Sequence, residues 1–144
     1  MVKEIWFDMD GTIADLYADP DWLPKLRAYD PMPYQTAKPM VNMSLLARYI
    51  HKAQKAGYKV GIVSWLSKDS DKGYDWAVSV VKRNWLKAHL PSVVWDEVKI
   101  VAYGTPKHEL CEGILFDDEL YNRLAWGRGA YEPTEIFKVL KALA

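Results

Sequence analysis

The amino-acid sequence predicts an α/β fold, namely a Rossmann-like, doubly wound and mainly parallel sheet with a minimal cap insertion. Two observations predict it. Short apolar runs at residues 5–7, 58–63, 99–103 and 113–116 alternate with longer stretches of helical period. The runs end at polar or glycine-containing turns. A helix between two buried strands makes a crossover connection, so the strands that it joins are expected to be parallel.

The first strand, IWF at residues 5–7, is expected to be central because it is apolar on both faces. It ends in the sequence DMDGT at residues 8–12, which places the carboxylates of Asp8 and Asp10 at its carboxyl end. Ligands of open α/β sheets bind at that edge. Taken alone, the pattern fits a solvated Asp-Gly turn equally well.

An insertion at about residues 17–40 follows this turn. Its five prolines exclude a long helix, although residues 22–29 could form two helical turns. The insertion also carries Trp22, Tyr29 and Tyr34. Long irregular insertions are often lids or binding loops, and a packed surface loop without a functional role is the alternative.

The remaining elements follow in order. A helix is expected at residues 41–56, with Asn42 or Ser44 as its N-cap and Gly57 after its end. Residues 65–73 are expected to be a loop, and residues 75–89 a helix that ends before Pro91. Its buried side is expected to be formed by Ala77, Val80, Val81, Trp85 and Ala88. A short helix at 119–126, an edge strand at 130–131 and a helix at 133–143 complete the chain.

Composition limits the classes of function. The 144 residues are expected to form a single domain, and 19 basic against 19 acidic residues leave no basic surface for nucleic acid. The single cysteine, Cys111, cannot form an internal disulfide and suits a reducing cytoplasm. No run of 18 apolar residues is present, and the N-terminus is unlike a signal peptide, so we expect a cytoplasmic protein without a membrane partner.

Further polar residues follow the other predicted strands. Ser64 follows the second strand, Lys107 lies shortly after the third, and Asp117 and Asp118 follow the fourth. A parallel sheet brings these positions to one edge, where several carboxylates would repel one another. A divalent cation relieves that repulsion, and an all-oxygen set of ligands favours Mg²⁺. A lysine and a hydroxyl beside such a cluster suit a phosphoryl group.

The order DxDGT, strand-end serine, lysine and DD resembles the phosphatases of the haloacid dehalogenase superfamily. The motifs span residues 5–118. The resemblance implies a Mg²⁺-dependent phosphomonoester hydrolase in which Asp8 becomes an aspartyl-phosphate and Asp10 acts as acid and base. It implies phosphate binding by Ser64 and Lys107. The other residues that it places at the phosphate are Gly11, Thr12 and Trp65. Metal ligands would come from Asp8, Asp10 and either Asp117 or Asp118, a choice that the sequence leaves open.

The substrate implied is a small phosphate ester. The spacing of Lys107 from the Asp pair and the small insertion resemble the 5'(3')-deoxyribonucleotidase branch, which makes a mononucleotide one candidate and Trp22, Tyr29 and Tyr34 candidate stacking residues. The insertion is shorter than the cap of that branch, so macromolecular esters, a nucleic-acid 3'-phosphate or a phosphoprotein, are the alternative. A non-catalytic phospho-ligand binder is a second alternative. A response-regulator receiver fits less well, because its acidic pair precedes the phosphoacceptor.

Overall fold

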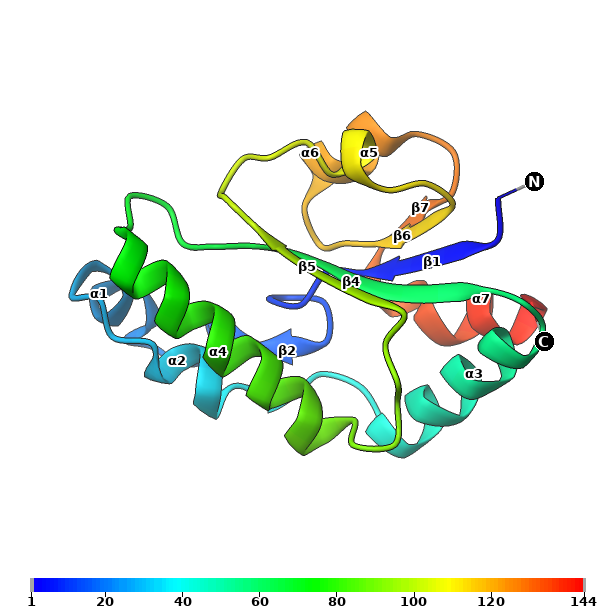
Figure 1. The fold of residues 1–144 in the computed structure, drawn as a ribbon, viewed down its shortest axis with the longest axis horizontal. Coiled ribbons are helices and arrows are strands. Elements are labelled where there is room, and N and C mark those ends of the chain that lie inside the picture. Colours follow the sequence, from blue (N-terminus) through cyan, green and yellow to red (C-terminus); the bar gives the residue numbers. More distant parts are fainter. Residues whose placement is uncertain (1, 144) are drawn as a thin grey trace.

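The computed structural model describes residues 2–143, which form one five-stranded sheet with helices on both faces (Figure 1). The strands are β1 (Glu4–Phe7), β4 (Lys59–Trp65), β5 (Glu97–Val101), β6 (Ile114–Phe116) and β7 (Ala130–Tyr131). Their order is β5-β4-β1-β6-β7, and every pair is parallel. The predicted parallel sheet with a central first strand is therefore confirmed, and its topology is compatible with a Rossmann-like fold.

The chain reverses its direction across the sheet beside β1. It first builds β1, β4 and β5 toward one edge, and then returns to add β6 and β7 on the other side. Adjacent connections on opposite sides leave a crevice outside the carboxyl ends of β1 and β6. Both strands are followed by aspartates, so the topology directs these side chains into the crevice.

The two faces of the sheet are covered unequally. On one face lie α3 (Met43–Lys55), α4 (Lys72–His89) and α7 (Ile136–Leu143), over a core that includes Phe7 and Ile62 (Figure 1). The other face carries the short helices α5 (Lys107–Leu110) and α6 (Leu120–Trp126), around Trp6, Val63 and Leu115. Successive residues of a strand point to opposite faces, which assigns each strand-end side chain to one of the two layers.

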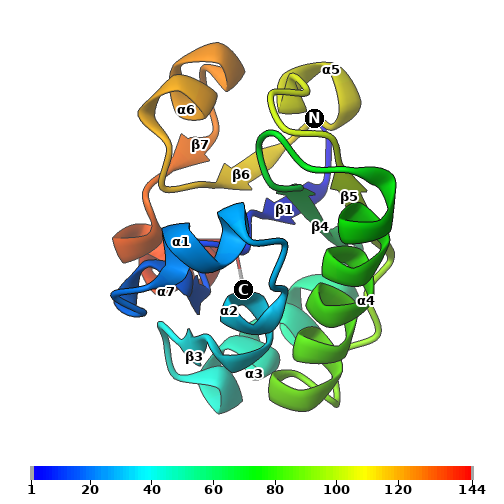
Figure 2. The same cartoon turned by 90° about the vertical axis from the view of Figure 1, so that its left-hand side faces the viewer.

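Residues 14–39 form a layer beside the carboxyl edge of the sheet (Figure 2). Strands β2 (Ala14–Asp15) and β3 (Lys38–Pro39) pair antiparallel and enclose a 3₁₀ turn (Leu16–Ala18), α1 (Trp22–Arg27) and α2 (Met32–Thr36). The second of these helices packs on α4. Tyr34 is buried, the Tyr74 hydroxyl donates to the Asp30 carbonyl at 2.9 Å, and the Trp85 indole donates to the Ala37 carbonyl at 2.7 Å. By contrast, α1 has no buried residue.

Three predictions of detail were wrong. Helix α4 begins at Lys72, where Asp71 caps it by accepting from the Tyr74 N–H, so the predicted loop is shorter. Of the five residues expected on its buried side only Trp85 is buried, because the buried row is Tyr74, Val78, Lys82, Trp85 and Leu86. Strand β5 starts and ends two residues before the predicted run. Of the two N-cap candidates for α3, Asn42 and Ser44, Asn42 is the one that caps the helix, by accepting from the Leu45 N–H. Within residues 2–143, no helix is both long and apolar enough to cross a membrane.

Candidate functional site

The predicted acidic residues meet where β1 and β6 end. Phe7 and Phe116 are register partners in these adjacent strands, so Asp8 and Asp117 leave the sheet side by side. The Asp8 N–H donates to the Phe116 carbonyl at 2.9 Å, which extends the ladder into the turn. Because Phe7 and Phe116 both face the α3/α4/α7 layer, alternation turns the two aspartates toward α5 and α6.

Lys107 lies between these two aspartates. Its Nζ is 2.9 Å from Asp8 Oδ1 and 2.7 Å from Asp117 Oδ2, and its side chain is only 2% exposed. Burial alone would lower the pKa of this amine, but the two carboxylates overcome it and raise the pKa above its ordinary value. Lys107 is the first residue of α5 and does not directly follow a strand, yet it reaches the predicted position.

The turn after β1 is held by its own backbone and by Thr12. The N–H groups of Gly11 and Thr12 donate to the carbonyls of Ala14 (2.8 Å) and Met9 (3.1 Å), so both residues shape the turn. The fully buried Thr12 hydroxyl donates to Asp8 Oδ2 at 3.0 Å. Gly11 has φ +79, and a Cβ there would collide with the Asp118 carboxylate.

Asp117 accepts hydrogen bonds from three donors of the protein. Besides Lys107, its Oδ2 accepts from Asn122 Nδ2 at 3.1 Å, and its Oδ1 accepts from the Glu119 N–H at 2.9 Å. Burial and the neighbouring charge of Asp8 raise the pKa of Asp117 to about 6, against the opposing effect of Lys107. This carboxylate is therefore placed to hold Lys107 and α6.

Asp118 has far fewer donors. Within residues 2–143 its carboxylate accepts one hydrogen bond, a long one of 3.5 Å from the Thr12 hydroxyl, which lies closer to Asp8 Oδ2 at 3.0 Å. Burial and repulsion by Asp8 raise the pKa of Asp118 to about 8. Lys107 forms ion pairs with Asp8 and Asp117, whereas an ionised Asp118 has no ion-pair partner within residues 2–143.

Carboxylate oxygens of Asp8, Asp117 and Asp118 all lie within 4.8 Å of one another. Three acids share one lysine, so the cluster retains negative charge, and its donor set is purely oxygen. Both properties fit Mg²⁺. Since Asp117 already accepts from three protein donors, Asp8 and Asp118 are the carboxylates of this cluster that best fit a cation.

Asp10 and Ser64 are brought together by a residue that the sequence analysis missed. Lys82, on α4, places its Nζ 2.8 Å from Asp10 Oδ2, 2.7 Å from Ser64 Oγ and 2.8 Å from the Trp65 carbonyl. Its exposed fraction is 1%. Burial raises the pKa of Asp10, and the charge of Lys82 opposes that shift. Alternation along β4 explains the contact, because Ser64 points to the α4 side while Val63 faces α5 and α6.

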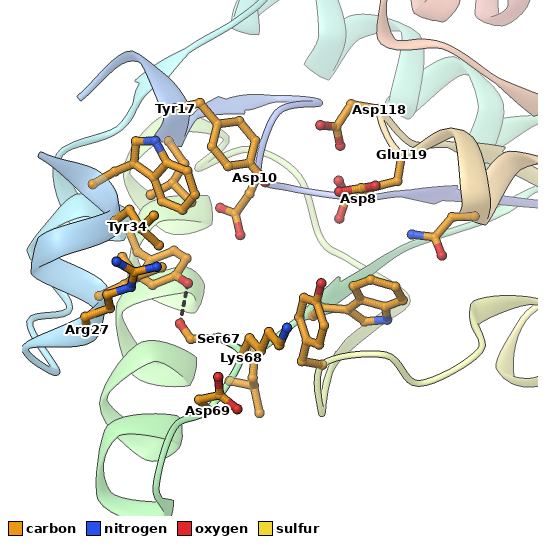
Figure 3. Close-up of a pocket in the computed structure, with 18 of the residues that line it drawn as sticks. Asp8, Asp10, Tyr17, Arg27, Tyr34, Ser67, Lys68, Asp69, Asp118 and Glu119 are labelled. Atoms are coloured by element: carbon orange, nitrogen blue, oxygen red, sulfur yellow. Dashed lines mark hydrogen bonds between the residues drawn. The ribbon is translucent and has the colours of Figure 1, made fainter. Parts of the chain in front are cut away.

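A cavity of about 640 Å³ is lined by Asp8, Asp10, Lys107 and Asp118, and Figure 3 shows the carboxylates of Asp8, Asp10 and Asp118 among its lining residues. Its walls come from the insertion and from the segments that follow β4, β5 and β6. The three predicted stacking residues, Trp22, Tyr29 and Tyr34, all line it. The lining residues that the sequence analysis did not single out include Tyr17, Arg27, Lys68, Tyr103 and Asn122.

The aromatic residues of the cavity differ in how exposed they are and in how firmly their neighbours hold them. The Tyr34 hydroxyl lies 2.5 Å from Ser67 Oγ and its ring is 4% exposed, so Tyr34 is mainly a packing residue. Trp22 is half-buried against Tyr17, with ring centroids 4.9 Å apart, and Tyr29 is 49% exposed.

Trp65, predicted at the phosphate, uses its indole N–H on the Thr105 carbonyl at 2.8 Å. Its ring lies 5.4 Å from Lys107 Nζ. The Trp65 side chain therefore holds the loop that leads to Lys107, and its backbone carbonyl holds Lys82.

Sequence signals for the missed residues differ. Lys82 interrupts a row of apolar residues spaced by four, Tyr74, Val78 and Leu86, and a lysine in such a row indicates a buried charge. Tyr17 and Tyr103 carry no comparable signal, because their positions depend on how the loops fold.

Comparison with known proteins leaves the family undetermined: no family model matches the chain, and no curated protein matches it significantly in sequence.

Proposed function

We propose that the chain is a Mg²⁺-dependent phosphomonoester hydrolase of the haloacid dehalogenase type, acting through an aspartyl-phosphate on Asp8. The observation that carries the proposal is the setting of Asp8. Its two oxygens are held by Lys107 (2.9 Å) and Thr12 (3.0 Å), and its neighbours along the sheet edge are the acids and the serine that such chemistry needs.

Asp8 would be the nucleophile. A carboxylate oxygen attacks phosphorus, the bond between phosphorus and the ester oxygen breaks, and the leaving alcohol takes a proton. Lys107 has three N–H donors, of which two reach Asp8 and Asp117, so one remains for a phosphoryl oxygen. Within residues 2–143, the backbone N–H groups of Met9 and Asp10 make no hydrogen bond and are available to the same group.

Asp10 would supply that proton and later remove one from the attacking water. Burial raises the pKa of its carboxyl, which favours the protonated form that an acid catalyst needs. Its Oδ2 is engaged by Lys82, and Oδ1 has no hydrogen bond within the described residues, so Oδ1 is the oxygen for the leaving group. Hydrolysis of the aspartyl-phosphate by water then regenerates Asp8 and releases phosphate.

Asp8, Asp118 and the backbone carbonyl of Asp10 are the groups that would hold Mg²⁺. Bound there, the cation would offset the charge of the carboxylates and of the phosphoryl group. Asp117 would act indirectly, by fixing Lys107 at 2.7 Å.

A small phosphate ester with a planar group, such as a mononucleotide, is the substrate that the cavity favours. A volume of about 640 Å³ lies within the range of small-molecule sites, and Trp22 and Tyr29 contribute aromatic rings to its lining. Trp65 and Tyr103, which also line the cavity, pack together with ring centroids 5.1 Å apart.

Phosphate release with and without Mg²⁺ tests the proposal. The panel contains nucleoside 5'- and 3'-monophosphates, sugar phosphates, a 3'-phosphorylated oligonucleotide, a phosphopeptide and an aryl phosphate. We expect Mg²⁺-dependent hydrolysis that Asp8→Asn abolishes, with mononucleotides preferred. Turnover of only the macromolecular esters would keep the hydrolase and reject the nucleotide. Mg²⁺ binding without any turnover would favour the non-catalytic binder.

A further inference from the structure

The Lys82 amine is one of the most completely enclosed charges in the described part of the chain. It is 1% exposed, and its three N–H donors match three acceptors: Asp10 Oδ2, Ser64 Oγ and the Trp65 carbonyl. The Tyr34 ring covers it, with the centroid 4.9 Å from Nζ. Water is therefore replaced by fixed protein groups around the amine.

A stabilising role alone explains this arrangement poorly. Burying an ammonium group is costly, and replacing a buried ion pair with apolar residues is often neutral or stabilising. The position lies in the otherwise apolar buried row of α4, between Val78 and Leu86. The contacts with Asp10 and Ser64, two members of the candidate site, suggest what the lysine contributes.

The Ser64 contact fixes the direction of a proton. An ammonium group has donors only, so Ser64 Oγ must accept from Lys82 at 2.7 Å. The hydroxyl proton of Ser64 then has to point elsewhere, and within residues 2–143 it has no other hydrogen-bond partner. A phosphoryl oxygen at the sheet edge would be its acceptor.

The Asp10 contact fixes an orientation. The bond from Lys82 holds Oδ2 at 2.8 Å and turns the carboxyl group so that Oδ1 is the oxygen left for the substrate. We propose that Lys82 is a positioning residue that aligns Asp10 for proton transfer to the leaving group and Ser64 for donation to the phosphate. This inference rests on the proposed phosphomonoester hydrolysis and adds to it a residue from the opposite layer of the sheet.

The two effects differ in their dependence on substrate. Proton donation by Asp10 matters greatly for a basic alkoxide and little for a nitrophenolate, which leaves without a proton. Donation by Ser64 acts on the phosphoryl group and is the same for every ester. A lysine that merely supported the fold would affect all esters equally.

The experiment measures kcat/KM for phenyl, 4-nitrophenyl and alkyl or nucleotide phosphates, using wild type, Lys82→Met, Lys82→Gln, Asp10→Asn and Asp10→Asn/Lys82→Met. Lys82→Met should lower kcat/KM about 100-fold or more for the alkyl ester and about 10-fold or less for the nitrophenyl ester. Lys82→Gln should keep part of the activity, because its amide can donate to one acceptor. Lys87→Met, at an exposed position of the same helix, is the control and should be unchanged.

The double variant separates positioning from support of the fold. In the Asp10→Asn background, loss of Lys82 should cost only the uniform factor of about 10 or less, because the acid that it aligns is already absent. This comparison stands even if Lys82→Met does not fold, since the double variant leaves no unpaired buried charge.

Equal losses for all esters, or fully additive losses in the double variant, would refute the alignment of Asp10 by Lys82, while wild-type turnover preserved the hydrolase. A wild type without turnover would remove the proposed function, and this inference with it.

Discussion

Two buried lysines hold the two aspartates of the DMDGT turn, and they come from opposite faces of the sheet. Lys107, on α5, binds Asp8 and Asp117, whereas Lys82, on α4, binds Asp10 together with two neutral oxygens. Both ammonium groups are almost completely enclosed. The two halves of the site therefore use the same kind of side chain in different electrostatic settings.

The difference lies in the charge that each lysine leaves uncompensated. On the Lys107 side one cation faces three carboxylates, Asp8, Asp117 and Asp118, so negative charge remains. On the Lys82 side one cation faces one carboxylate, and the charges balance. The first half is suited to a divalent cation and a phosphoryl group, and the second to holding a proton donor in place.

The largest contrast is expected between Lys107→Met and Lys82→Met. Loss of Lys107 leaves two buried carboxylates unpaired and should lower the free energy of unfolding by about 3–5 kcal/mol. It should also reduce kcat/KM by about 10²–10³-fold for every ester, because a donor to the phosphoryl group is gone. Thermal unfolding and initial rates measure both effects. If the loss of kcat/KM in Lys107→Met depended on the leaving group as strongly as in Lys82→Met, the two halves of the site would not differ in function.

Substitutions of Asp118 and Asp117 should distinguish binding of the metal from positioning of Lys107. Asp118→Asn should raise the Mg²⁺ concentration for half-maximal activity about 100-fold, because a direct ligand is lost, and Asp117→Asn about 10-fold or less. Activity titrated with Mg²⁺ measures both. If Asp117→Asn raised the required Mg²⁺ concentration more than Asp118→Asn, the direct metal ligand would be Asp117 and not Asp118.

The pH dependence of stability should reveal the excess charge. In the folded protein the pKa of Asp118 is raised to about 8 from its ordinary 3.8, so between these values the native state holds a proton that the unfolded state lacks. The contribution of Asp118 to the stability of the metal-free protein therefore becomes increasingly unfavourable as pH rises from 3.8 toward 8. Mg²⁺ should raise the melting temperature more at pH 8 than at pH 5, and Asp118→Asn should flatten the metal-free slope. A slope identical in Asp118→Asn and wild type would contradict this origin.

The smallest effect is expected at the aromatic wall. Trp22→Ala should raise KM for a mononucleotide about 10-fold, with little change in kcat, since stacking on one base is worth about 1–3 kcal/mol. The phenyl phosphate rate should change less. Trp76→Ala is the matched control, because Trp76 is 72% exposed and outside the cavity. Equal effects of both substitutions would mean that Trp22 is not a substrate contact.

The Lys107 half could be predicted from the sequence and the Lys82 half only in part. Asp8, Ser64, Asp117 and Asp118 follow apolar runs, and a parallel sheet gathers such positions at one edge whatever the details of packing. Lys82 lies within a helix, where its role depends on which side of α4 faces the sheet. The predicted side, with Val80 and Ala88, was wrong, so Lys82 was missed.

The insertion was predicted as a region but not in its internal structure. Its prolines limit α1 and α2 to six and five residues, and their positions depend on contacts such as Tyr74 to Asp30 that are distant in sequence. The proposed preference for Asp118 over Asp117 as a metal ligand likewise rests on the hydrogen bonds from Asn122 and Glu119 to Asp117, which the sequence does not reveal.

The covalent role of Asp8 is tested most directly by trapping the aspartyl-phosphate. Wild type is quenched during Mg²⁺-dependent turnover, reduced with borohydride and digested, and the peptide containing residue 8 is analysed by mass spectrometry. We predict homoserine at position 8 in wild type with substrate, and none without substrate or in Asp8→Asn. Steady turnover with an unmodified Asp8 peptide, or an active Asp8→Asn protein, would contradict the assignment of Asp8 as the nucleophile.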